Sequence, residues 1–219
     1  MNGKKATTTL WVKKIENGWI KLKQYPIISS KINRGIDVYA FDKLDGSNIR
    51  AEWHSKKGFW KFGSRNRLLG SDQPTIIEAQ TLIEDKYAED LGAVFENQRY
   101  SKVVAFFEFY GPNSFAGNHK DELHDVLLFD ISPHKNGILP PNKFIKLYQH
   151  LDIPKVILHG KISCVTDSLI RIGHFEDITF EGVVCKANDG TMFKVKTAAW
   201  LDKLKNFCGK DKKLLEKLK

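Results

Sequence analysis

The sequence predicts an α+β fold built on antiparallel sheets, and three observations lead to this class. Segments that alternate apolar and polar residues, the pattern of a half-buried strand, outnumber helical segments along the chain. Two pairs of these segments are joined by short turns, as in β-hairpins. No regular succession of strand, helix and strand appears, which argues against a doubly wound parallel sheet.

The first half of the chain is expected to contain three strands and one long helix. Residues 36–42 alternate and predict a strand, and residues 49–65 predict a hairpin whose turn lies at residues 55–58. Pro74 suits the first turn of a helix, and an apolar stripe with helical spacing follows it. The stripe consists of Ile76, Ile77, Leu82, Ile83, Tyr87, Leu91, Val94 and Phe95.

The second half is expected to mix strands with short helices. The predicted elements are strands at 102–110 and 124–131, a helix at 142–150, a strand at 155–163, a helix near 166–174 and a hairpin formed by 178–186 and 191–196. A lysine-rich amphipathic segment closes the chain. We therefore divide the protein into a main domain, residues 1–199, and a basic helical tail, residues 200–219.

Composition and charge restrict the class of protein. A chain of 219 residues with 42% hydrophobic residues can bury one full core, and no apolar run approaches the roughly 18 residues of a membrane span. The 3 cysteines are widely spaced, which argues against a disulfide framework and a zinc site. A net charge of +9 favours a polyanionic partner, most commonly nucleic acid, although a merely soluble basic protein carries the same charge. We expect a soluble, cytoplasmic monomer that has no membrane segment.

The segment Lys43-Leu44-Asp45-Gly46 puts a lysine directly before a tight Asp-Gly turn. A free lysine has a pKa near 10.4 and becomes nucleophilic when burial and neighbouring cations lower that pKa. Lys194 and Lys196 are two residues apart, so on a strand both side chains point to one face. From that face their positive charges would lower the pKa of Lys43 and would bind a triphosphate. The alternatives are a surface lysine beside a common type I′ turn and a solvated strand face.

Glu108 and Glu181 each interrupt an apolar strand. A carboxylate in such a run is costly unless a partner or a hydrogen bond compensates for its burial. A ribose hydroxyl or a metal-bound water would supply that compensation, and a structural salt bridge is the alternative for each glutamate. Phe129, in another apolar run, suits stacking on a purine base and equally suits the core.

Basic residues gather around the predicted hairpin that follows Lys43. They are Lys56, Lys57, Lys61, Arg65 and Arg67, with Trp60 and Phe62 between them. Such a patch is typical of a surface that contacts nucleic-acid phosphates, and a solvated hairpin edge is the alternative. We expect this patch to lie near Lys43. The lysine-rich tail is either a further surface for nucleic acid or an ordinary solvated helix.

Over residues 38–196 the chain resembles the superfamily of covalent nucleotidyltransferases that contains polynucleotide ligases and mRNA capping enzymes. The resemblance rests on five segments in the same order: the Lys43 segment, Arg65-Asn66-Arg67, Glu108-Phe109-Tyr110-Gly111, Glu181-Gly182-Val183-Val184 and Lys194-Val195-Lys196. The chain is most similar to the phage-type RNA ligases that seal double strands, because Asn48 stands five residues after Lys43, where those ligases carry Asn. Asp45, in contrast, is typical of DNA ligases and capping enzymes.

The resemblance implies an antiparallel-sheet, ATP-grasp-like adenylation domain and a three-step reaction. Lys43 attacks the ATP α-phosphate, AMP passes to the 5′-phosphate of a nick, and the 3′-hydroxyl displaces it. The implied roles are ribose contact for Glu108, adenine stacking for Phe129, metal and phosphate chemistry for Glu181, α-phosphate binding for Lys194 and Lys196, phosphate or metal-bound water contact for Arg65 and Asn48, and adenine contact for Asp42. The implied cofactors are ATP and Mg²⁺, or Mn²⁺ in its place, and the implied partner is nicked duplex nucleic acid.

Only 23 residues follow Lys196, so we expect no appended OB-fold domain and a near-minimal catalytic module. The leading hypothesis is an ATP-dependent RNA ligase, and a minimal DNA ligase is the first alternative. A GTP-using capping enzyme and a non-catalytic nucleic-acid-binding module of the same fold are further alternatives. Covalent labelling by nucleotide distinguishes the enzymes from the binding module.

Overall fold

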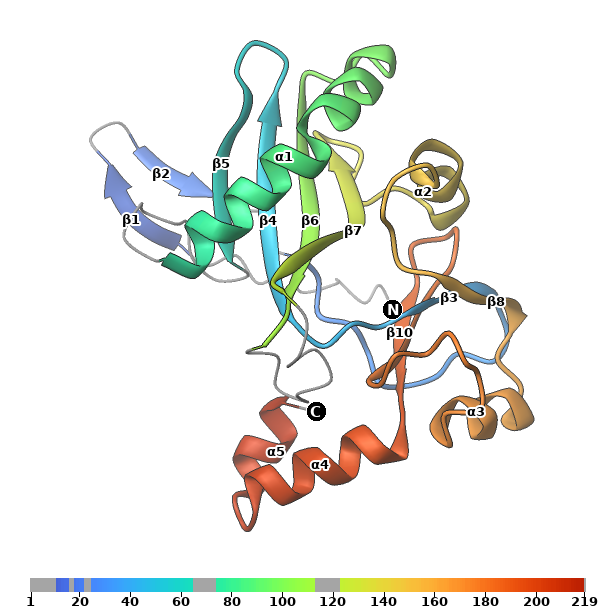
Figure 1. The fold of residues 1–219 in the computed structure, drawn as a ribbon. Coiled ribbons are helices and arrows are strands. Elements are labelled where there is room, and N and C mark those ends of the chain that lie inside the picture. The colour runs from blue at the N-terminus through green and yellow to red at the C-terminus, as the bar shows by residue number, and fades with distance from the viewer. Residues whose placement is uncertain (1–10, 16–17, 22–24, 65–73, 113–122, 219) are drawn as a thin grey trace, which may run out of the picture.

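The computed structural model describes residues 11–15, 18–21, 25–64, 74–112 and 123–218. Its framework is a pair of four-stranded antiparallel sheets, and a two-stranded ribbon of β1 (Trp11–Ile15) and β2 (Gly18–Lys21) lies beside them (Figure 1). Helices pack on the outer faces of the two large sheets. The predicted α+β class with antiparallel sheets is confirmed.

The first large sheet is named the α1 sheet because helix α1 (Pro74–Asn97) covers one of its faces (Figure 1). Its strand order is β5 (Gly58–Ser64), β4 (Ser47–His54), β6 (Lys102–Tyr110) and β7 (Asp125–Pro133). Alternate residues of β4 and β6 meet the apolar stripe of α1, as the sequence predicts. The stripe is shorter than expected, because Ile77 is 48% exposed.

The second large sheet is named the β3 sheet. Its strand order is β10 (Met192–Lys196), β9 (Gly182–Lys186), β3 (Asp37–Asp42) and β8 (Val156–Lys161), and helix α3 (Cys164–Arg171) packs on it. The predicted strand 178–186 is wrong in its first four residues, since β9 begins only at Gly182. The reason is tertiary: the carboxylate of Asp42 accepts hydrogen bonds from the backbone N and the hydroxyl of Thr179 and holds that segment as a loop.

Lys43 to Gly46 form the link that crosses from β3 in one sheet to β4 in the other. Neither Asp45 nor Gly46 has a positive φ, so the type I′ turn of the alternative interpretation is absent at this Asp-Gly pair. Gly46 is required for another reason, because a Cβ there would lie 2.4 Å from the carbonyl oxygen of Phe109. The segment Lys43 to Gly46 therefore lies in direct contact with the backbone of β6 in the α1 sheet.

Three helices complete the described part of the chain: α2 (Pro141–Tyr148), α4 (Ala198–Cys208) and α5 (Lys212–Leu218). Helix α2 joins the two sheets, since Phe144 lies in the core under α1 and its ring meets that of Phe41 on β3. The tail is two helices rather than one, and the chain turns at Gly209, whose φ is 53°. None of the described helices has the length and apolar character that a membrane crossing requires.

Candidate active site

A single buried carboxylate joins two of the three lysines that the sequence singled out. Glu181 Oε2 lies 2.6 Å from Lys43 Nζ, and Glu181 Oε1 lies 2.6 Å from Lys196 Nζ. Lys43 follows β3, Glu181 precedes β9 and Lys196 ends β10, so adjacent strands of one sheet bring the three together. The arrangement concentrates two cations and one anion at the edge where the chain crosses to the α1 sheet.

Backbone contacts hold this cluster in place. Lys43 N donates to the carbonyl oxygen of Gly182 at 2.9 Å. Gly182 has a φ of 129°, and a Cβ at this position would lie 2.1 Å from the carbonyl oxygen of Val195. A side chain is therefore excluded on both conformational and steric grounds, and the glycine next to Glu181 allows β10 to approach closely.

The electrostatics of Lys43 differ from the sequence-based expectation. Burial acts to lower the pKa of Lys43, but the negative charges of Glu181, Glu108 and Asp45 outweigh it and raise that pKa above the ordinary lysine value. The expected lowering by burial and neighbouring cations is therefore wrong for this arrangement. The cluster holds Lys43 as an ammonium ion.

Lys196 shows the opposite balance. Burial lowers its pKa to about 8, Glu181 acts against this shift, and the positive charges of Lys43 and Lys194 add to it. Its Nζ also lies 3.3 Å from the centroid of the Trp200 ring. In β10, Lys194 pairs with Val184 and Lys196 pairs with Gly182, so the two lysines share one face as the sequence predicts.

Glu108 and Asn48 face this cluster from the α1 sheet. They are paired across β6 and β4, and Glu108 Oε1 accepts a hydrogen bond of 3.1 Å from Gly46 N. Burial raises the pKa of Glu108 to about 7, against the influence of Lys43. The side-chain oxygen of Asn48 is buried and has no hydrogen-bond partner among the described residues. Glu108, whose charge acts on Lys43, and Asn48, its partner on the same face of the α1 sheet, thus offer oxygen atoms to a ligand.

Phe129 lies in a network that sequence reasoning missed. Lys186 Nζ donates to the carbonyl oxygen of Phe129 at 2.7 Å and to Asp130 Oδ2 at 2.8 Å. The hydroxyl of Tyr25 donates to the same carboxylate oxygen of Asp130, and the Tyr25 ring centroid is 5.0 Å from that of Phe129. An Asp and a Lys inside apolar strands were an available signal for the ion pair, whereas nothing in the sequence marked Tyr25.

Asp42 has other surroundings than expected, and two further predicted residues are not among those described. Both carboxylate oxygens of Asp42 bind Thr179, so this residue anchors the loop before Glu181; its predicted contact with adenine stays a prediction. The predicted patch contains Arg65 and Arg67, which lie outside the described residues.

The hairpin lysines do not lie near Lys43, contrary to expectation. Lys56 and Lys57 are in the turn beyond His54, at the far end of β4 from the Lys43 link (Figure 1). At about 3.3 Å per residue, β4 alone separates its two ends by about 23 Å. Lys57 and Lys61 instead pack on Trp60, with their Nζ atoms 4.6 and 3.9 Å from the ring centroid.

A divalent cation fits this site when most of its ligands are waters and substrate phosphates. Within the described part of the chain no cluster of three or more His, Cys, Asp or Glu side chains is arranged to hold a metal. The oxygen donors near Lys43 are Glu108, Asp45 and Glu181, and the buried Asn48 oxygen belongs to the residue paired with Glu108. Oxygen ligands and retained water are what Mg²⁺ prefers.

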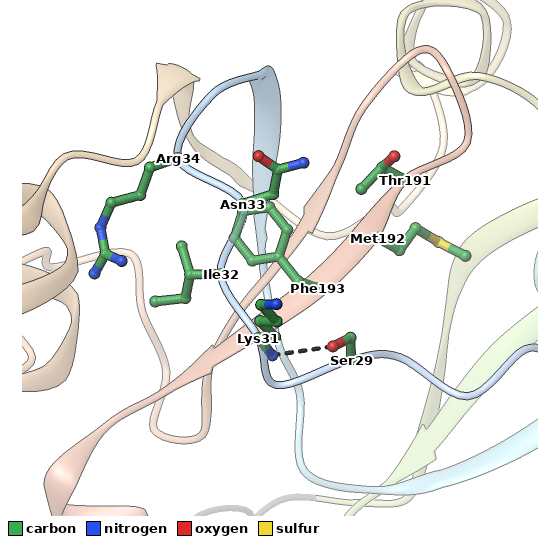
Figure 2. A pocket seen from close by; sticks show the side chains of 8 residues that line it. All are labelled: Ser29, Lys31, Ile32, Asn33, Arg34, Thr191, Met192 and Phe193. Atoms are coloured by element: carbon green, nitrogen blue, oxygen red, sulfur yellow. Dashed lines mark hydrogen bonds between the residues drawn. The ribbon is translucent and has the colours of Figure 1, made fainter. Parts of the chain in front are cut away.

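A separate groove of about 490 Å³ lies outside this cluster. It runs between the 29–34 segment and the start of β10, and Figure 2 shows Lys31 and Arg34 along it. Arg34 is paired with Asp167 at 2.8 Å. The lining contains none of the residues of the Glu181 cluster.

Similarity to known proteins agrees with the fold and the order of these residues. A family model described as RNA ligase matches residues 36–197, and no curated protein matches. Among solved structures, a Naegleria gruberi RNA ligase mutant with ATP and Mn has a TM-score of 0.61 and 18% identity over 78% of this chain and 52% of its own. The same organism's RNA ligase with PPi has a TM-score of 0.60 and 18% identity over 84% of this chain and 60% of its own.

The likeness to these structures is one of fold, and this chain spans between about half and three fifths of their length. The family match extends from the residue before β3 to the residue after β10 and so includes both large sheets and the Glu181 cluster. Since that match covers most of the sequence, the chain belongs to the RNA ligase family.

Proposed function

We propose that the protein is an ATP-dependent RNA ligase that seals nicks through a lysyl-AMP intermediate on Lys43, with residues 1–199 as the adenylyltransferase domain. The observation that carries the proposal is the cluster in which Glu181 contacts Lys43 and Lys196 at 2.6 Å each. It brings a candidate nucleophile within reach of the cations that phosphoryl-group chemistry needs. The Naegleria RNA ligase structures with ATP and Mn support the choice of nucleotide and metal.

In the first step, the neutral amine of Lys43 attacks the α-phosphorus of ATP. A nitrogen–phosphorus bond forms, the bond to the bridging oxygen breaks, and pyrophosphate leaves. Lys194 and Lys196 stabilise the negative charge on the phosphate oxygens as it is redistributed. A bound Mg²⁺ or Mn²⁺ supplies further neutralisation of the triphosphate charge.

Lys43 must pass a proton to solvent water before this attack, and the position of the Glu181 carboxylate controls when it does so. Glu181 is the main charge that raises the pKa of Lys43, while burial acts in the opposite direction. Because Glu181 is shared with Lys196, a shift of the carboxylate toward Lys196 removes that stabilisation of the ammonium ion. Burial then favours the neutral amine.

Glu108 and Phe129 form the nucleoside part of the proposed site. Glu108, whose pKa is about 7, binds the ribose hydroxyls, and the Phe129 ring stacks on adenine. The network of Lys186, Asp130 and Tyr25 holds the backbone and the ring of Phe129. Asp42 is the remaining proposed contact to adenine.

The second and third steps take place on a nicked duplex. AMP moves from Lys43 to the 5′-phosphate of the nick, and the 3′-hydroxyl then attacks that phosphate and releases AMP. Asn48 and Arg65 are proposed to bind phosphate or metal-bound water in these steps. The buried side-chain oxygen of Asn48, which faces Glu108 across the strand pair, supports its part in the assignment.

The decisive experiment incubates the purified protein with Mg²⁺ and ATP labelled at the α-phosphate. We expect one covalent AMP per chain, lost in Lys43→Ala and retained in Lys161→Ala, which removes an exposed lysine at the end of β8. Labelling by GTP in place of ATP would identify a capping enzyme. If no adduct forms, even after pyrophosphate treatment to remove AMP that is already bound, the protein is a non-catalytic nucleic-acid-binding module. Sealing of nicked RNA and nicked DNA by the labelled protein then decides between the two ligases.

A further inference from the structure

Three loops meet at the end of the α1 sheet that is remote from Lys43. They are the β4–β5 turn, the loop before β6 and the loop after β7. Ser55 N donates to the carbonyl oxygen of Ser101 at 3.1 Å, and His134 N donates to that of Lys102 at 2.9 Å. Segments about 45 and 30 residues apart in the sequence are therefore fixed side by side by backbone hydrogen bonds.

These loops form a cationic surface, named here the basic end. It consists of Lys56, Lys57, Arg99, Lys102 and Lys135, all of them exposed. Residues 54–58, 98–102 and 133–137 contain no Asp or Glu, and Glu96 at the end of α1 is the nearest acidic residue before Arg99 in the sequence. Within the described ranges, no cation of the basic end takes part in an ion pair.

Two residues of this surface have left-handed backbone conformations. Arg99 has a φ of 55° and Lys135 a φ of 69°, and among the described residues they are the only non-glycine residues with positive φ. Helix ends and tight turns are where this region is ordinarily occupied. Arg99 is the capping residue that ends α1, with Tyr100 N bound to the Phe95 carbonyl oxygen. Lys135 lies in the turn that Asn136 N and the Pro133 carbonyl oxygen close, so both cations stand on backbone of defined geometry.

An exposed aromatic ring lies next to these loops. The register of β4 and β5 shifts between Glu52 and Trp53, and Trp60 lies in the irregular part of β5. Trp60 is 40% exposed although Lys57 and Lys61 pack on its ring. Flat aromatic surface beside positive charge is the combination that nucleic acids bind.

We propose that the basic end binds the phosphate backbone of the duplex on one side of the nick, away from the reacting groups. The proposal rests on the proposed function and deepens it. Unpaired cations of one sign attract a dense polyanion and release its counterions. The length of β4, about 23 Å, corresponds to about seven base pairs of B-form DNA at about 3.4 Å each. The contact is thus an anchor that holds one arm of the substrate.

The test compares two triple variants of the full chain. Lys56→Ala/Lys57→Ala/Lys102→Ala removes three charges of the basic end. The control, Lys31→Ala/Lys143→Ala/Lys161→Ala, removes three exposed charges elsewhere, and none of the six lysines contacts the Glu181 cluster. Affinity for a fluorescent nicked duplex with a blocked 3′ end is measured by anisotropy at several salt concentrations, and self-adenylylation is measured in parallel.

We expect the basic-end variant to lose affinity by about tenfold or more at low salt and to reduce the slope of log affinity against log salt by about 2 to 3. The control variant keeps a slope within about 1 of the wild type. The defect disappears on duplexes whose arms are both shorter than about six base pairs, because such arms do not reach the basic end.

Equal losses in the two variants, or a defect that does not depend on arm length, would overturn the proposal. So would a variant that loses heparin binding but keeps duplex binding, which would identify a different polyanion. These outcomes are separate from failure of the proposed function: a protein that binds duplex through the basic end but forms no adduct with ATP would retain the anchor and lose the ligase assignment.

Discussion

Replacing Glu108 by glutamine separates the stability of the protein from its use of nucleotide. Glu108 lies on β6, and its Oε1 accepts a hydrogen bond from Gly46 N at 3.1 Å. Glutamine has nearly the same shape and keeps an acceptor oxygen for that bond. The variant therefore removes the ionisable proton and little else.

The magnitude follows from the pKa of Glu108, which burial raises from 4.5 to about 7. Below pH 4.5 the carboxyl is protonated in both the folded and the unfolded state, so it adds no pH-dependent cost. Between pH 4.5 and about 7 the unfolded state has lost its proton while the folded state keeps it, and stability falls as pH rises. At about 1.4 kcal/mol per pKa unit, the full cost above pH 7 is about 3 kcal/mol.

The assay is urea denaturation of the wild type and Glu108→Gln in steps from pH 4.5 to 8. We expect the free energy of unfolding of the variant, relative to the wild type, to rise by up to about 3 kcal/mol across this range. Glu89→Gln is the matched control, because Glu89 is exposed on α1, and its difference from the wild type should stay within about 0.5 kcal/mol.

A difference that is flat with pH for Glu108→Gln would refute the argument, since it would mean that Glu108 is not held in a desolvated environment. The effect on activity should be opposite to the effect on stability. At pH 8 we expect Glu108→Gln to be more stable than the wild type and to form less AMP adduct, because the buried carboxylate lowers stability but binds the nucleotide.

Gly182→Ala should lower the free energy of unfolding by at least about 2 kcal/mol, because a Cβ would lie 2.1 Å from the Val195 carbonyl oxygen and the φ of 129° disfavours a side chain; an unfolding midpoint equal to that of the wild type would contradict this. Tyr25→Phe should raise the KM for ATP in self-adenylylation about tenfold with little change in kcat, since it removes the hydroxyl bound to Asp130 but keeps the ring beside Phe129; an equal fall in kcat would argue against a role in positioning. Raising salt should depress nick sealing before it depresses self-adenylylation, because only sealing requires a polyanion to bind over a long surface; parallel loss of the two rates would argue against this.

Local patterns predicted most of the fold. The alternation in β3, β4 and β6 and the stripe of α1 depend on which residues face the core, and that information lies within a few residues of sequence. One error arose where a distant group intervenes, because hydrogen bonds to Asp42 hold Thr179 in a loop instead of a strand. The other is local, because Gly209, with a φ of 53°, ends α4 and divides a lysine-rich segment that was expected to be one helix.

The residue types of the candidate site could also be predicted, but their electrostatics could not. The order of Lys43, Glu181 and Lys196 in the sequence indicated that they act together, and the structure brings them into contact. The predicted direction of the pKa shift of Lys43 was wrong, because burial and three carboxylates act on this lysine at the same time. Their net effect can be worked out only when the positions of these groups in space are known.

The sequence by itself determined which chemical groups this protein has and the strands and helices that carry them. Only the tertiary structure decided that Lys43 is held as an ammonium ion, that Tyr25 supports Phe129, and that the hairpin lysines belong to a surface far from the nucleophile. The physical reason is distance along the chain. Lys43 and Glu181 are 138 residues apart, and Tyr25 and Asp130 are 105 apart. Propensity and periodicity act over a few residues, whereas charge, burial and hydrogen bonding act between whichever groups the fold brings within a few ångströms.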